Sequence, residues 1–175
     1  GLMKNIKLVS EYLLKTNDSK YTMHLIPTKT GEDYYFDEEI KKYLPQKAKC
    51  IEDALADYQK TLLPNATSFG KTIWIDNKYI GDIWCYCMDK INEPNAMISY
   101  CIFDKVYLKK GIATEALRLF LQEISERFQL KSFGAFTYSE NVSSIRVLEK
   151  NGFKLIETWV EDNIESKYYQ YNRWK

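Results

Sequence analysis

The sequence has almost no net charge, a single histidine and no long apolar run, and each shortage excludes a class of function. Its 175 residues include 25 Lys plus Arg and 24 Asp plus Glu, a formal net charge of +1. This balance gives no electrostatic reason to expect nucleic acid or an anionic membrane as a partner. No apolar run approaches the roughly 18 residues that span a bilayer, and the start, GLMKNIKLVSEYLLK, lacks the apolar core of a signal peptide. We therefore expect a cytoplasmic protein.

Ligands for a metal ion are also scarce. The only histidine is His24, and the cysteines are Cys50, Cys85, Cys87 and Cys101. A C-x-C pair with one further cysteine does not match the usual zinc spacings, so we expect no metal and reduced thiols. Because Cys85 and Cys87 are two residues apart in a strand-like run, they are predicted to share one face of a sheet.

The chain has enough apolar residues for one sizeable core, since 45% of them are hydrophobic and 15% aromatic. Its length favours a single domain, and it contains no internal repeat, low-complexity tract or linker. Periodicity in the first third predicts four elements. They are a helix over Asn5–Leu14, a strand over Tyr21–Ile26, and amphipathic helices over Asp37–Leu44 and Ile51–Leu63.

From Phe69 onward, apolar residues recur at every second position, as in strands. This pattern predicts a run of antiparallel strands, followed by a unit of one strand, one helix and one strand. The predicted elements are strands over Phe69–Ile75, Tyr79–Met88 and Met97–Phe103, a helix over Thr114–Phe128, and a strand over Ser132–Tyr138. A helix between two strands of one sheet implies that the strands are parallel with a right-handed crossover.

The C-terminal part predicts a short helix and a last hairpin. The helix covers Asn141–Lys150 with Val142, Ile145 and Leu148 facing inward, and Gly152 suits the left-handed residue after it. FKLIETWV and SKYYQYNRW would pair around the turn at 161–163.

The loop before the long helix is a candidate anion site. It holds Lys109, Lys110 and Gly111 between an apolar strand and a helix start, where backbone N–H groups and the helix dipole favour negative charge. Gly111 allows a close backbone approach, so the loop suits a phosphate.

Two segments together carry a resemblance to a known family. Lys110–Leu117 (KGIATEAL) looks like the acetyl-CoA pyrophosphate loop of the GNAT superfamily of N-acetyltransferases. Asn141–Phe153 (NVSSIRVLEKNGF) resembles the N-x-x-S-x-R-V-x-E-K-x-G-F signature of the branch that includes the ribosomal-protein N-terminal acetyltransferases (RimJ/RimL-like).

The resemblance implies a fold and a domain organisation. The fold is α/β (α+β), a GNAT-like mixed and mostly antiparallel sheet with helices on both faces and a splay between the strands at 97–103 and 132–138. Residues 1–175 would form a single GNAT-like acetyltransferase domain. The resemblance covers about 21–174, and the helix predicted from periodicity lies outside it, in an N-terminal helical extension over residues 1–17.

The resemblance also implies acetyl-CoA as cofactor and transfer of its acetyl group to a primary amine, by direct attack in a ternary complex without metal or covalent enzyme intermediate. Asn141 would hydrogen-bond the cofactor arm and Ser144 would lie near its sulfur, while a backbone amide of the splayed strand would stabilise the oxyanion. The remaining implied cofactor contacts are Ile102, Phe103, Leu108, Lys109, Lys110, Gly111, Ile112, Ala113 and Thr114.

The chain departs from the family where many members place a tyrosine as the acid for the leaving thiolate, because Leu148 occupies that stretch. Ser144 is the first candidate for this acid and Tyr138 the second. Glu140 and Asp82 are both available as the carboxylate that takes the amine's proton, and the sequence does not choose between them.

Simpler interpretations and rival functions stay open. Lys109 and Lys110 could be a solvated loop pair, Asn141 a plain helix cap, and Ser144 a packing residue. A non-catalytic acyl-CoA sensor on the same fold is one rival, and the acceptor is either a protein N-terminus or a small amine such as an aminoglycoside or polyamine. The protein would be a monomer or a homodimer.

Overall fold

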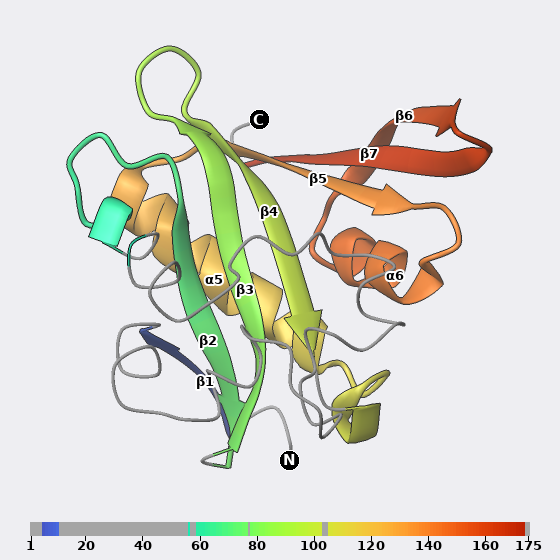
Figure 1. Cartoon of the computed structure of the whole chain (residues 1–175), viewed down its shortest axis with the longest axis horizontal. Helices are drawn as coiled ribbons and strands as arrows, with labels where there is room; N and C mark the ends of the chain where they lie inside the picture. The colour runs from blue at the N-terminus through green and yellow to red at the C-terminus, as the bar shows by residue number, and fades with distance from the viewer. Residues whose placement is uncertain (1–4, 11–55, 57–58, 77, 103–104, 174–175) are drawn as a thin grey trace.

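The fold of this chain is built on one seven-stranded sheet. The computed structural model describes residues 5–10, 56, 59–76, 78–102 and 105–173 (Figure 1). In chain order the elements are β1 (Ile6–Ser10), β2 (Phe69–Ile75), β3 (Lys78–Asp89), β4 (Asn95–Ile102), the 3-10 turn η3 (Lys105–Tyr107), α5 (Ile112–Phe128), β5 (Ser132–Tyr138), α6 (Val142–Lys150), β6 (Lys154–Glu161) and β7 (Ile164–Asn172).

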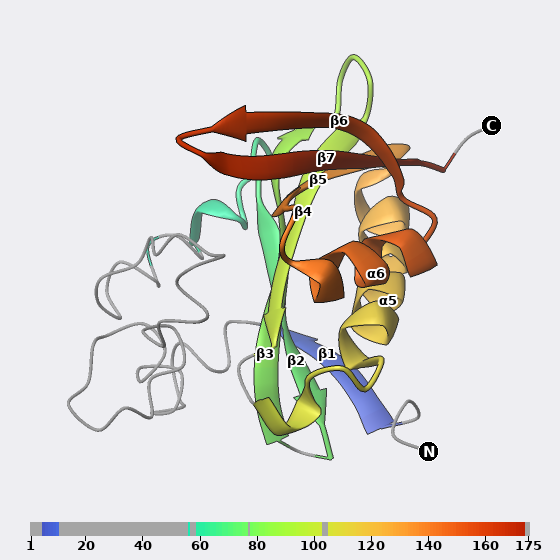
Figure 2. The same cartoon turned by 90° about the vertical axis from the view of Figure 1, so that its right-hand side faces the viewer.

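The strand order is β1-β2-β3-β4-β5-β7-β6, and among these neighbours only β4 and β5 run parallel. This confirms the predicted mixed, mostly antiparallel sheet and the parallel crossover through α5. Both α5 and α6 cover the same face of the sheet (Figure 2). The predicted elements at 21–26 and 37–44 lie outside the described residues. Of the predicted helix 51–63 the structure describes Ala56, Gln59 and Lys60 as helical, whereas residues 61–63 form a turn, so the predicted end at Leu63 is wrong.

The core lies between α5 and the sheet. α5 begins two residues before the predicted Thr114, and its three- and four-residue repeat of apolar side chains forms one buried stripe. The buried apolar side chains of that stripe are Ile112, Ala116, Leu117, Phe120, Leu121 and Ile124. They pack with the inward residues of the central strands, so α5 is fixed on the sheet along its whole length.

The prediction of an N-terminal helix is wrong for residues 6–10. They form β1, an edge strand that pairs antiparallel with β2, so that Ile6 lies opposite Ile75. Ile6 is buried in the core, and the Thr72 hydroxyl donates to the Val9 carbonyl oxygen at 2.8 Å. The spacing of Ile6 and Val9 suits a helix, but pairing with the open edge of β2 stabilises the strand instead. The predicted helical extension over 1–17 is therefore wrong in this part.

The prediction that Cys85 and Cys87 share a face is also wrong. The register of β3 against β4 shifts between Tyr86 and Asp89, and Cys87 has a φ of 50°. This bulge turns the Cys87 side chain to solvent, whereas Cys85 is buried. Within the described part of the chain, no three His, Cys, Asp or Glu side chains are grouped so that they could hold a metal ion.

The C-terminal elements match the sequence prediction with one exception. Leu148 is buried and Ile145 partly so, but Val142 in the first turn of α6 is exposed rather than inward. Gly152 has a φ of 89°, which confirms the left-handed residue after the helix. Among the described helices, none has both the length and the apolar character needed to cross a membrane.

Candidate functional site

A gap opens in the sheet where β4 and β5 separate. They pair only at Asn95 with Ser132, Ala96 with Phe133, and Met97 with Gly134. Beyond this point β4 continues to Ile102 and β5 to Tyr138, while β4 stays paired with β3 and β5 with β7. The two strands diverge and α6 lies across the angle between them (Figure 1). This confirms the predicted splay and leaves backbone groups of the second half of β4 facing the gap.

The start of α5 lies close to the end of β4 in the chain and has free backbone donors. Gly111 is the N-cap residue in the left-handed conformation (φ 78°, ψ 4°), and no side chain caps the helix. The first helical bond runs from the Glu115 N–H to the Gly111 oxygen at 3.1 Å. The N–H groups of the first turn, at residues 112–114, therefore have no partner within the helix.

The flanking loop adds positive charge to these donors. Lys109 also has a left-handed backbone (φ 59°), and the side chains of Leu108, Lys109 and Lys110 are exposed. A tight loop of backbone N–H groups with two nearby cations is suited to an anion.

α6 brings Asn141 and Ser144 to the same gap. Asn141 is the N-cap residue, and its Oδ1 accepts a hydrogen bond from the Ser144 N–H at 3.2 Å. The simple interpretation of Asn141 as a helix cap is thus confirmed. The cap uses only the oxygen of the side-chain amide, so its NH2 group can still donate to a ligand.

Tyr100 contacts Ser144, and sequence reasoning did not single it out. Its hydroxyl lies 3.1 Å from Ser144 Oγ and donates to the Ser144 carbonyl oxygen at 3.2 Å. Burial raises the pKa of the Tyr100 hydroxyl, and the hydrogen bond with Ser144 opposes this only in part. The sequence pattern that could have identified Tyr100 is its spacing of two residues from Ile98 and from Ile102, which places it on the same inward face of β4.

The other candidate catalytic residues differ in how far their side chains are buried. Tyr138 ends β5 and is partly buried, and Glu140 is exposed in the turn that leads to Asn141. Asp82 is buried in β3, opposite Cys101 of β4, and its Oδ1 accepts a hydrogen bond from the Tyr79 hydroxyl at 2.6 Å. The structure thus brings Tyr138 and Glu140 to the start of α6, and places Asp82 in the neighbouring strand.

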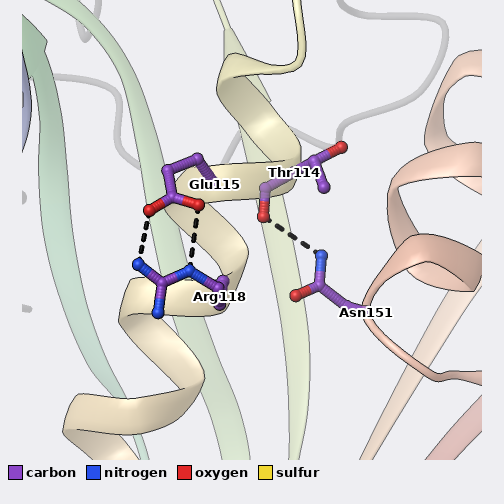
Figure 3. A network of polar contacts seen from close by, with 4 residues as sticks. All are labelled: Thr114, Glu115, Arg118 and Asn151. Carbon is purple, nitrogen blue, oxygen red and sulfur yellow. Dashed lines mark hydrogen bonds and ion pairs between the residues drawn. The ribbon is translucent and has the colours of Figure 1, made fainter. Parts of the chain in front are cut away.

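A second link joins α6 to the start of α5. The Asn151 side-chain NH2 donates to the Thr114 carbonyl oxygen at 3.1 Å and to that of Val147 at 3.0 Å. Figure 3 shows this contact beside the Glu115–Arg118 pair of α5. The first turn of α5 and the last turn of α6 are therefore held at a fixed distance.

Comparisons with known proteins agree with this geometry. A family model described as "Acetyltransferase (GNAT) domain" matches residues 26–154. The chain is 30% identical over 122 residues to the uncharacterized N-acetyltransferase YnaD of Bacillus subtilis (strain 168), and the match covers 70% of each chain.

Solved structures show the same fold at low identity. A structure of the ribosomal-protein alpha-N-acetyltransferase RimL in complex with coenzyme A is similar with a TM-score of 0.75 and 15% identity, covering 98% of this chain and 96% of that one. Spermidine N-acetyltransferase from Vibrio cholerae, in complex with CoA and spermine, is similar with a TM-score of 0.73 and 14% identity, covering 97% and 96%. Since the family model covers most of the chain and the fold agrees, this protein belongs to the GNAT family of acetyltransferases.

Proposed function

We propose that this protein transfers an acetyl group from acetyl-CoA to a primary amine, by direct attack in a ternary complex and without a metal or a covalent enzyme intermediate. One observation carries the proposal. The parallel strands β4 and β5 stop pairing at Met97 and Gly134, beside a helix whose first turn has free backbone donors. A pantetheine arm and a diphosphate need these two features together.

The residues present fit the cofactor. The amides at 112–114 and the side chains of Lys109 and Lys110 would hold the pyrophosphate. The half of β4 that does not pair with β5, up to Ile102, would donate to and accept from the amide groups of the pantetheine arm. Phe103, a further proposed contact, lies outside the described residues. Asn141 would use its NH2 group on the same arm, because its oxygen already caps α6.

Acetyl-CoA supplies an activated acetyl thioester, and this chain's residues supply orientation and proton transfer. An ammonium acceptor loses two protons overall: one ends on the coenzyme A thiol and one passes to solvent. Ser144 is the proposed acid for the thiol, with Tyr138 as the second candidate. Glu140 is the proposed carboxylate for the amine's proton, acting through water, since it is exposed where β5 ends.

The acceptor class is a primary amine. The relatives of known structure act on different amines, a ribosomal protein and spermidine among them. Because these relatives use different amines, the proposal covers both protein N-termini and small-molecule amines.

Calorimetry with acetyl-CoA tests the proposal first. We expect a Kd for acetyl-CoA in the micromolar range. No detectable binding at millimolar acetyl-CoA would refute the proposed function. The second step measures thiol release from acetyl-CoA over a panel of N-terminal peptides, polyamines and aminoglycosides. Binding without release above background would identify a non-catalytic acyl-CoA sensor instead.

A further inference from the structure

We propose that Tyr100 is a positioning residue for Ser144, and that it holds the Ser144 side chain and the first turn of α6 in place across the gap between β4 and β5. The inference rests on the proposed function. In this proposal, Tyr100 on β4 orients Ser144 on α6, the proposed acid.

The two residues belong to opposite sides of the gap. Tyr100 lies on the half of β4 that no longer pairs with β5, and Ser144 lies on α6, which follows β5 directly. Backbone hydrogen bonds hold β4 and β5 together only as far as Met97 and Gly134. The Tyr100–Ser144 contact therefore fixes the width of the gap at a place where the sheet does not.

Ser144 is held at three atoms. Its N–H donates to Asn141 Oδ1, its carbonyl oxygen accepts from the Tyr100 hydroxyl, and its Oγ lies within hydrogen-bond distance of the same hydroxyl. The first two contacts hold the backbone of Ser144, and the contact at Oγ is the one that orients its side chain. The Tyr100 hydroxyl therefore restrains the rotamer of Ser144.

Counting donors gives two arrangements of the hydroxyl hydrogens, because Tyr100 has only one O–H hydrogen. When that hydrogen is donated to the Ser144 carbonyl oxygen, the Ser144 hydroxyl donates to Tyr100, and when it turns to Ser144 Oγ, the Ser144 hydrogen can point into the gap. A raised pKa means that Tyr100 keeps this hydrogen at neutral and mildly alkaline pH. Tyr100 therefore keeps its hydrogen in both arrangements and orients Ser144, which stays the proposed acid for the leaving sulfur.

The kinetic test is a double-mutant cycle of Tyr100→Phe and Ser144→Ala. The Phe variant keeps the ring and removes only the hydroxyl. We expect kcat to fall about 10-fold while the Kd for acetyl-CoA stays within about 2-fold, because one hydrogen bond to the acid is lost and none to the cofactor. In the Ser144→Ala background, Tyr100→Phe should change kcat by less than about 2-fold, because the hydroxyl there contacts only the backbone carbonyl oxygen of residue 144. An equal fall in both backgrounds would overturn the proposal.

The matched control is Tyr171→Phe. Tyr171 is also partly buried and stacks on Phe133, with 6.3 Å between ring centroids, but it lies on β7 away from the gap. We expect its kcat to match that of the wild type. A fall equal to that of Tyr100→Phe would mean that loss of any core hydroxyl slows the enzyme, and the proposal would be wrong.

A structural readout separates this inference from the proposed function. Amide hydrogen exchange of residues 144–148 should become about 5-fold faster in Tyr100→Phe, from the loss of one hydrogen bond to the first turn of α6, and should not change in Tyr171→Phe. If no amine is acetylated, the proposed function fails while this measurement still decides the positioning role. Unchanged exchange in Tyr100→Phe would refute it.

Discussion

At the scale of single residues, the left-handed backbone of Gly111 is the feature that shapes the loop before α5. Gly111→Ala places a Cβ on a residue with a φ of 78°, which costs about 1–2 kcal/mol or shifts the loop. We expect acetyl-CoA binding to weaken at least 10-fold, measured by calorimetry. Gly152→Ala is the matched control, since Gly152 also has a positive φ (89°) but follows α6. It should lose stability and keep its affinity, and equal losses of affinity would contradict the assignment of the loop.

Because of a buried thiol and a buried phenol, the free energy of unfolding depends on pH in the alkaline range. Burial raises the pKa of Cys85 from its ordinary value of 9.0 to about 12, and burial also raises the pKa of Tyr100. Above pH 9 the unfolded chain releases the Cys85 proton while the folded chain keeps it. The free energy of unfolding is therefore largest below pH 9 and falls as the pH rises from 9 toward 12, by up to about 1.4 kcal/mol per pH unit for Cys85. The raised pKa of Tyr100 adds to this fall only above its ordinary value of 10.0.

Urea unfolding at about pH 8 and about pH 10.5 checks this slope. Cys85→Ala should reduce the pH dependence, whatever its effect on absolute stability. A wild-type protein whose stability is flat between these pH values would contradict the prediction.

At the scale of elements, α6 is tied to α5 by the side chain of Asn151. Asn151→Ala removes the donor to the Thr114 carbonyl oxygen, so the first turn of α5 is held less firmly against α6. We expect a loss of about 1 kcal/mol in stability and an acetyl-CoA affinity that is a few-fold weaker, measured by urea unfolding and calorimetry.

Arg118→Ala is the control for this contact. Arg118 pairs with Glu115 on the exposed side of the same helix start, with Nε 2.9 Å from Oε2 (Figure 3). Exposed ion pairs contribute little, so neither stability nor affinity should change much. If both variants weakened the affinity equally, the effect would belong to the helix start in general and not to the contact with α6.

At the scale of the whole molecule, β1 completes the sheet on the side away from the gap and contacts α5. Ile6 is buried in the core formed by β2 and α5, so Ile6→Ala should cost about 2–4 kcal/mol by urea unfolding. Lys7→Ala, one residue away on the exposed face, should change stability by less than about 0.5 kcal/mol. A stability cost of the same size at both positions would contradict the role of β1 as part of the core.

The site was predictable from the sequence where its parts are local. Gly111, the lysines before it and Asn141 belong to short motifs, and the structure places each at a helix start as those motifs require. Tyr100 and Asn151 were not predictable in this way. Their partners are 44 and 37 residues away, and no local pattern says which side chain of one element meets which atom of another.

The sequence by itself determined the spacing of apolar residues from Phe69 onward. That spacing predicts the strands, α5, α6 and the parallel crossover. The spacing of apolar residues decides which face of a helix or strand is buried, whichever element packs against that face. Only the tertiary structure decided that Ile6–Ser10 is a strand, that Cys87 points away from Cys85, and that the predicted splay of β4 and β5 begins after Met97 and Gly134. These outcomes depend on an open sheet edge, a bulge and the end of a strand pairing, which arise from contacts between elements distant in the chain.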